Sequence, residues 1–432
     1  MLADDRVAYP MNFFLRFEFT GSLDQHVLQR SLEESALQHP LLTATICRTA
    51  GHWGWQRKLQ TTPRLHDMTR QGVAGPLRFR PLDVRHSAGL QAFLCARGNK
   101  SELWLQVHHS CADAVGVLHF VRSWFVRYEK LLSGAAQHNL MFPNQRKTWI
   151  VPDGQTCRPD LPRWRYMSPR RREWRRLANF AVHRPRRILA PERTSKATPH
   201  EAPWPAFVRR KMNWTADAWR RTKAGLPPDA SLNDLLVTGL FSTIARWNDD
   251  VVKRRRDYSL RIAMPVDLRA ATGNVAEARN HVSIVFLDRT SRAIRDGQDL
   301  LAGICQETGW VKNHHGAFVL HDVLNALHGV PGGIEALTAP TTCTSTTVLS
   351  NLGPLSRYLP HSQRLQLGEA TLTDVDFLPP IRPGTLAAFG ILTYGDEIGV
   401  GMQYDRLRLS PLIAEMLLDR VVSTWEQDLA GG

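Results

Sequence analysis

Hydrophobic and polar residues follow two different periods along this chain. Alternation with a period of two predicts a strand with one buried face, and apolar residues three or four positions apart predict a helix. The sequence accordingly predicts helices at 23–40, 231–247 and 410–429, and strands at 12–21, 258–269, 281–288 and 386–405. Pro40 is expected to stop the first helix, Ser231 to cap the second, and a Gly-Asp turn to divide the last strand segment into a hairpin. Both halves mix helices and strands, so the predicted fold class is α/β.

The stretch 102–132 changes its period in the middle. Its first part alternates as a strand does, with Trp104, Gln106 and His108 on one face. After Asp113 the apolar residues take helical spacing. His108 and His109 are therefore expected where a strand ends and a loop leads into a helix, a place where a rigid backbone can hold a side chain in a cleft.

Length and composition indicate the number of domains and the class of protein. The chain has 432 residues, 43% of them hydrophobic and 22% charged, which fits a globular protein of two or three domains and excludes a disordered or fibrous one. No stretch approaches the roughly 18 apolar residues of a membrane span. The first residues lack a basic start followed by an apolar core, so we expect no secretory signal and a cytoplasmic protein.

Positive charge is concentrated in one place. Residues 158–196 hold thirteen Lys and Arg and three acidic residues, and they supply most of the net charge of +15. Prolines interrupt the same stretch, which therefore reads as a connection containing one short helix. The resulting domain prediction is an N-terminal domain at 1–160, a basic Arg/Pro-rich connection at 161–200 and a C-terminal domain at 201–432.

This basic connection has four interpretations, which the sequence leaves open. A solvated linker is the default for a charge run. Such a run could also attract an acidic partner, a phosphate-bearing small molecule or an acidic protein, or rest on an anionic membrane surface through the helix that carries Trp174. Nucleic acid is not expected as a partner, because no recognised binding motif accompanies the charge.

The candidate chemistry lies in the histidine pair. A histidine near neutral pKa suits the removal of a proton from an attacking hydroxyl or amine. Asp113, four residues after His109, could orient the ring or brace the loop through a distant arginine. The alternative is a histidine pair that only packs at a strand end, and His314-His315, which lacks the following acid, is interpreted in that way.

The six cysteines predict neither a disulfide framework nor a zinc site, because they are scattered and contain no CxxC pair. Cys111 lies between the candidate base and the acid. A cysteine nucleophile needs a lowered thiol pKa, which nothing in the sequence indicates. We therefore expect no bound metal and interpret Cys111 as a loop residue.

At these residues the sequence resembles a known superfamily. His108-His109-Ser110-Cys111-Ala112-Asp113 is similar to the HHxxxDG signature of the acyl-thioester-dependent acyltransferases, which include chloramphenicol acetyltransferase, condensation domains, wax ester synthases and polyketide-associated acyltransferases. The resemblance covers most of the chain in order. Its further segments are 38–42 (the HP-x-L segment), 75–77, 264–269 (the arginine-bearing strand) and 350–354 (the SN-x-G segment).

The resemblance implies a pseudo-dimer of two chloramphenicol-acetyltransferase-like domains with mixed sheets and an active-site tunnel between them. His109 would be the general base and His108 mainly structural. Asp113 would brace the loop through an ion pair with Arg269. Asn351 would assist the developing oxyanion or hold the domains together.

Two departures from the family pattern bear on function. Ala114 stands where the signature has Gly, which demands ordinary backbone angles at that position. No DFGWG-like segment is present either, which weakens the interpretation as a carrier-fed condensation domain.

The sequence thus predicts an acyltransferase that moves an acyl group from a CoA or carrier-protein thioester to a hydroxyl or amine. The acyl-CoA or acyl carrier protein is a co-substrate, and no bound cofactor is expected. Two alternatives stay open: a condensation-type domain that forms amides, and a catalytically inactive condensation-like module that binds a carrier or ligand. A location in the cytoplasm, with peripheral contact to the membrane, is compatible with each of them.

Overall fold

The structure is a computed structural model of the chain, and two six-stranded sheets form its framework. It describes residues 2–49, 52–57, 61–69, 79–134, 151–152, 184–191, 204–213, 215–252, 257–272, 277–297, 299–313, 320, 324, 327, 329–339, 342–360 and 364–430. The predicted basic connection lies largely outside the described residues, as do His314-His315 and residues 75–77.

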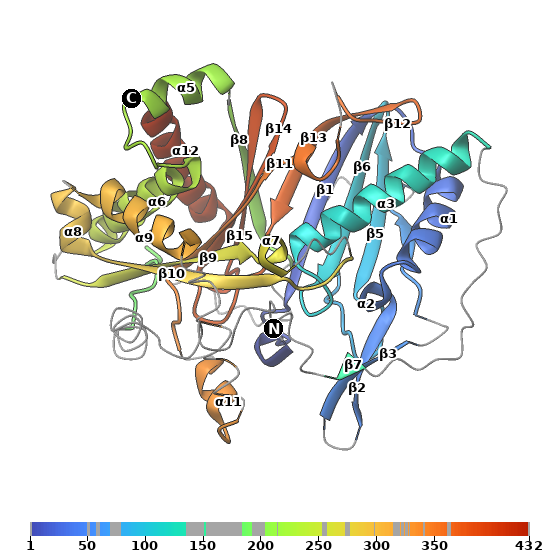
Figure 1. Cartoon of the computed structure of the whole chain (residues 1–432), viewed down its shortest axis with the longest axis horizontal. Coiled ribbons are helices and arrows are strands. Elements are labelled where there is room, and N and C mark those ends of the chain that lie inside the picture. The colour runs from blue at the N-terminus through green and yellow to red at the C-terminus, as the bar shows by residue number, and fades with distance from the viewer. Residues whose placement is uncertain are drawn as a thin grey trace.

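The first sheet has the strand order β12-β13-β1-β6-β5-β4. Its strands are β12 (Gln366–Leu367), β13 (Ala370–Leu378), β1 (Asn12–Thr20), β6 (Lys100–His108), β5 (Leu90–Arg97) and β4 (Leu65–Asp67). Helices α1 (Gln25–Ala36) and α3 (Ala114–Leu132) lie across one face of this sheet (Figure 1). The predicted alternation explains this packing, since Phe13, Leu15 and Phe17 of β1 share a core with both helices.

The second sheet has the order β10-β9-β11-β14-β15-β8. Its strands are β10 (Val282–Thr290), β9 (Ser259–Asp267), β11 (Thr347–Pro354), β14 (Ala387–Tyr394), β15 (Glu397–Tyr404) and β8 (Phe207–Asn213). The helices of this half are α5 (Ala216–Ala224), α6 (Leu232–Val251), α7 (Arg269–Thr272), α8 (Ser291–Asp296), α9 (Leu300–Asn313), α11 (Gly333–Leu337) and α12 (Pro411–Ala430). Strand β11 runs parallel to β9 and β14, so the sheet is mixed, as predicted.

Smaller elements complete the described chain. They are the short helices η1 (Leu2–Asp4), α2 (Pro40–Thr43) and η4 (Leu355–Arg357), and a three-stranded sheet of β2 (Ala44–Thr49), β3 (His52–Arg57) and β7 (Val151–Pro152).

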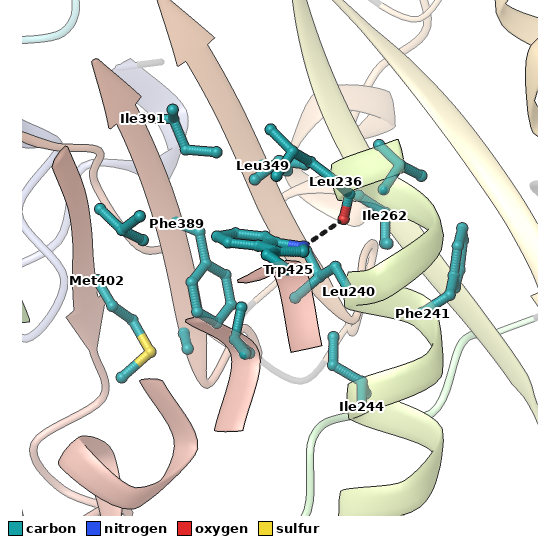
Figure 2. Close-up of a cluster of buried hydrophobic side chains, with 14 of the residues drawn as sticks. Leu236, Leu240, Phe241, Ile244, Ile262, Leu349, Phe389, Ile391, Met402 and Trp425 are labelled. Carbon is teal, nitrogen blue, oxygen red and sulfur yellow. Dashed lines mark hydrogen bonds between the residues drawn. The ribbon is translucent and has the colours of Figure 1, made fainter. Parts of the chain in front are cut away.

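The core of the second half joins α6 and α12 to the sheet. Trp425 of α12 is fully buried, and its indole N–H donates to the Leu236 carbonyl of α6 over 2.8 Å (Figure 2). Phe389 of β14 packs against the same indole ring. Helix α6 begins with the predicted Ser231 cap, which forms a reciprocal capping box with Asp234.

One sequence prediction needs correction at this level. The helix predicted at 23–40 is shorter, because Asp24 caps it at Gln25 and it ends at Ala36. Pro40 does not stop that helix but begins α2, a position where a missing backbone N–H costs nothing. The predicted domain bounds stay a prediction; β12 and β13 come from the C-terminal part of the chain but extend the first sheet.

A cluster of charged side chains lies where β13 joins the first sheet. Arg16 of β1 is buried, and its guanidinium pairs with Asp374 and Asp376 of β13 at 2.9 Å each and with Glu102 of β6 at 2.7 Å. Arg209 of β8, a strand of the second sheet, also contacts Asp376. Strand β13 therefore forms ion pairs with residues of both sheets.

Candidate active site at the junction of the two halves

The two motif histidines lie where the sequence places them. Strand β6 ends at His108, which pairs with Asn12 of β1, and α3 begins at Ala114. The apolar residues of β6 face α1 and α3, whereas Trp104 packs on the opposite face. The change of period between β6 and α3 therefore fixes a short turn at residues 109–113.

His109 is held through its backbone from both halves of the chain. Its N–H donates to the Met11 carbonyl (2.7 Å), and its own carbonyl accepts from the Asn280 side chain (2.8 Å). The imidazole meets the ring of Phe13 edge to face, with centroids 5.3 Å apart. Burial lowers the pKa of His109 below its usual value, against the opposing effect of the Asp113 charge. The ring is thus neutral at neutral pH, the form that can accept a proton.

The carboxylate of Asp113 accepts hydrogen bonds from several donors. It caps α3 by accepting the Gly116 N–H (2.7 Å), and it accepts the His281 N–H (2.6 Å). Arg269 binds both of its oxygens, with Nη2 at 2.9 Å from Oδ1 and Nη1 at 3.2 Å from Oδ2. Both partners of this ion pair are buried. The structure therefore contains the Asp113–Arg269 pair that the resemblance implies, and the carboxylate is engaged in holding the loop.

The Ala114 departure has a simple structural account. Asp113 is the N-cap, with extended backbone angles, and Ala114 is the first residue of α3. A helical residue needs no positive φ, so alanine fits this position without strain.

A segment that the sequence did not single out, residues 277–281, completes the site from the second half. Its Asn280 amide donates to the carbonyls of both His109 (2.8 Å) and Ser110 (3.0 Å). Its Ala278 N–H donates to Nδ1 of His39 (3.0 Å), just before α2. Irregular backbone carries these contacts, so no periodic signal in the sequence could have identified them.

His108 and Asn351 take positions different from that of His109. His108 is fully buried, with Nδ1 accepting the Ser110 N–H (3.2 Å) and Nε2 lying 3.3 Å from Asp5. Asn351 uses Oδ1 to accept the Gly353 N–H (2.8 Å) within its own strand, β11. Its hydrogen bond is thus local, and a role toward the oxyanion stays a prediction.

Cys111 has no feature of a nucleophile. Its side chain is fully buried beside Gly89, and burial raises the pKa of the thiol well above its usual value. The cysteines of the described segments form no disulfide with one another. Within those segments no group of three or more His, Cys, Asp or Glu side chains is arranged to hold a metal, and no helix has the length and apolar character of a membrane span.

Comparison with known proteins bears on the fold of the chain. Neither a protein-family model nor a curated protein matches the sequence. Among solved structures, trichothecene 15-O-acetyltransferase from Fusarium sporotrichioides matches with a TM-score of 0.68 and 11% identity, over 98% of this chain and 91% of that one.

Two further solved structures are similar over nearly the whole chain. The starter condensation domain of rhizomide synthetase, in complex with C8-CoA and Leu-SNAC, has a TM-score of 0.65 and 13% identity, over 100% of this chain and 91% of that one. Polyketide synthase associated protein 5 from Mycobacterium tuberculosis has a TM-score of 0.61 and 14% identity, over 97% and 94%. The chain therefore has the fold that this acetyltransferase, this condensation domain and this polyketide synthase associated protein share.

Proposed function

We propose that the protein transfers an acyl group from a thioester donor to a hydroxyl or amine acceptor, with His109 as general base. The observation that carries the proposal is a neutral, half-buried imidazole at the junction of the two halves, on a residue whose backbone is hydrogen-bonded to both of them. Asp113 is already engaged by Arg269 and two backbone N–H groups, so it acts as a positioning residue and not as the proton acceptor.

The reaction then follows from the chemistry of the ring. His109 takes the proton of the acceptor hydroxyl or amine as its oxygen or nitrogen attacks the thioester carbonyl. The tetrahedral oxyanion collapses, the carbon–sulfur bond breaks, and the departing thiolate receives the proton from the imidazolium. Base catalysis contributes roughly 10²–10⁴-fold, and holding both substrates in place supplies much of the remaining acceleration.

The donor class follows from two lines of support. A structurally similar condensation domain binds C8-CoA, and the chain has a net charge of +15, which favours the phosphates of coenzyme A or an acidic carrier protein. An amine acceptor would make the protein a condensation-type amide former, which uses the same base. The choice of acceptor is therefore part of the test.

The test is thiol release from a series of acyl-CoA donors with alcohol or amine acceptors, in the wild type, in His109→Ala and in His26→Ala. His26 is exposed on α1 and serves as the control. We expect acceptor-dependent release that falls at least about 10²-fold in His109→Ala and is unchanged in the control. A folded His109→Ala protein with the wild-type rate would exclude this base. Absence of release from both CoA and carrier donors would favour the binding module.

A further inference from the structure

We propose that Asp5, which the sequence did not single out, is a positioning residue that holds both motif histidines; this inference rests on the proposed function of His109. The carboxylate reaches the pair by two routes. Its Oδ2 lies 3.3 Å from Nε2 of His108, and its Oδ1 accepts the N–H of Met11 over 3.0 Å.

The contact between Asp5 and His108 concerns the tautomer of the His108 ring. Nδ1 of His108 accepts the Ser110 N–H, and a ring nitrogen that accepts a hydrogen bond carries no proton. The proton of the neutral ring is therefore on Nε2, which lies 3.3 Å from Asp5 Oδ2, close enough for electrostatic attraction but without the alignment of a hydrogen bond. Asp5 stabilises this tautomer, and the tautomer in turn keeps Nδ1 available to hold the turn that carries His109.

The second route reaches the base through the backbone. Asp5 Oδ1 closes the turn at residues 5–11 by accepting the Met11 N–H, and the Met11 carbonyl accepts the N–H of His109 over 2.7 Å. One carboxylate thus fixes the side chain of the first histidine and, through a single residue, the main chain of the second. A residue that holds a base in this way controls its orientation toward the acceptor.

The segment around Asp5 is itself anchored in the second half. Asp4 pairs with Arg382 at 2.6 Å, and the Arg6 guanidinium donates to the Thr338 carbonyl over 2.9 Å. The residues on either side of Asp5 therefore bind the second half, while the Asp5 carboxylate lies beside His108 at the end of β6 in the first half. The position of Asp5 relative to His108 is accordingly set by both halves of the molecule.

The variant Asp5→Asn tests the proposal because it keeps the shape and removes the charge. Asparagine has one oxygen and one NH₂ group, so either it presents hydrogens to the proton on His108 Nε2 or it loses the Met11 N–H. We expect the turnover number to fall roughly 10–100-fold while the KM for the thioester changes little. Asp217→Asn, an exposed aspartate on α5, is the matched control and should match the wild type.

The second measurement does not depend on activity. Imidazole ¹⁵N NMR spectra report which ring nitrogen carries the proton, and a His108→Gln variant identifies the His108 signal by its loss. We expect the Nε2–H tautomer of His108 in the wild type and in Asp217→Asn. In Asp5→Asn we expect a change in the imidazole ¹⁵N signal of His108. An unchanged His108 signal, or a changed signal with an unchanged turnover number, overturns the proposal. A wild type without transferase activity instead refutes the proposed function, while the tautomer measurement still tests the contact.

Discussion

At the scale of the residue, the ion pair of Asp113 and Arg269 joins the loop of the first half to the second half. The pair is buried, and each partner makes further hydrogen bonds: Asp113 to backbone N–H groups and Arg269 to Asp267 and the Arg279 carbonyl. A buried pair of this kind contributes little net stability compared with apolar residues, but breaking it leaves an uncompensated charge. Its removal should therefore affect both stability and the position of His109.

Replacing Asp113 by Asn should destabilise the protein by about 3 kcal/mol, because the buried Arg269 guanidinium loses its buried counter-charge and keeps only the more exposed Asp267. Thermal unfolding should show a much lower Tm, and acyl transfer should fall with it. The double variant Asp113→Asn/Arg269→Met should lose less stability than the sum of the single variants. An additive double variant, or an unchanged Tm in Asp113→Asn, would contradict the bracing role.

At the scale of the element, strand β13 lies against β14 and β15, and its backbone comes close to three of their glycines. Glycines make this possible: a Cβ at Gly399 would lie 2.7 Å from the Val375 carbonyl oxygen, and a Cβ at Gly390 or Gly401 would overlap the Phe377 carbonyl. The backbone φ of these three glycines is not positive. Close approach, and not backbone conformation, therefore requires glycine here.

Replacing Gly399 by Ala should lower the free energy of unfolding by about 1–3 kcal/mol, because the added methyl group pushes β13 away from β15. Gly309→Ala is the matched control, since a Cβ there meets open space within α9. That control should raise stability by up to about 1 kcal/mol through helix propensity. Urea unfolding midpoints measure both changes, and equal midpoints for Gly399→Ala and the wild type would refute the close approach as the cause.

The same elements show how far the sequence could predict the structure. Periodicity located β1, α6, β9, β10 and the β14–β15 hairpin, because each has one face toward a core. The change from strand spacing to helical spacing located the turn at 109–113. The contacts of Asn280, Ala278 and Asp5 come from irregular segments, whose hydrogen bonds depend on tertiary position and leave no period in the sequence.

At the scale of the whole molecule, the two halves meet through hydrogen bonds that depend on protonation. His39 lies just before α2 in the first half, and its Nδ1 accepts the Ala278 N–H from the second half. Burial, with a smaller contribution from the nearby His119, lowers the pKa of His39 to about 4. The folded protein therefore favours the neutral ring, and protonation removes the acceptor that joins the halves.

This shift predicts a loss of stability in acid. The pKa of His39 is about 4 in the folded state and 6.5 in the unfolded state, so unfolding takes up a proton between these values. Stability should fall as the pH falls from 6.5 toward 4, by on the order of 2–3 kcal/mol from this group.

Measurements of the free energy of unfolding from pH 7 to 4 check this expectation. His39→Asn places an oxygen at the position of Nδ1 and keeps an acceptor that does not titrate. Its stability should depend less on pH over this window than that of the wild type. Identical pH profiles for the two proteins would exclude His39 as the group responsible.

Strand β13 comes late in the chain but pairs with β1 in the first sheet, so the first sheet cannot be complete until β13 has been synthesised. Arg16 of β1 meets Asp376 of β13, 360 positions later in the chain. At about 5–20 residues per second, a ribosome needs roughly 20–70 s to make the chain between them. Throughout this interval β1 has an unpaired edge, and Arg16 lacks two of its carboxylate partners, Asp374 and Asp376. The first sheet is therefore completed only late in translation, and the nascent chain is most exposed to aggregation and most dependent on chaperones before β13 emerges.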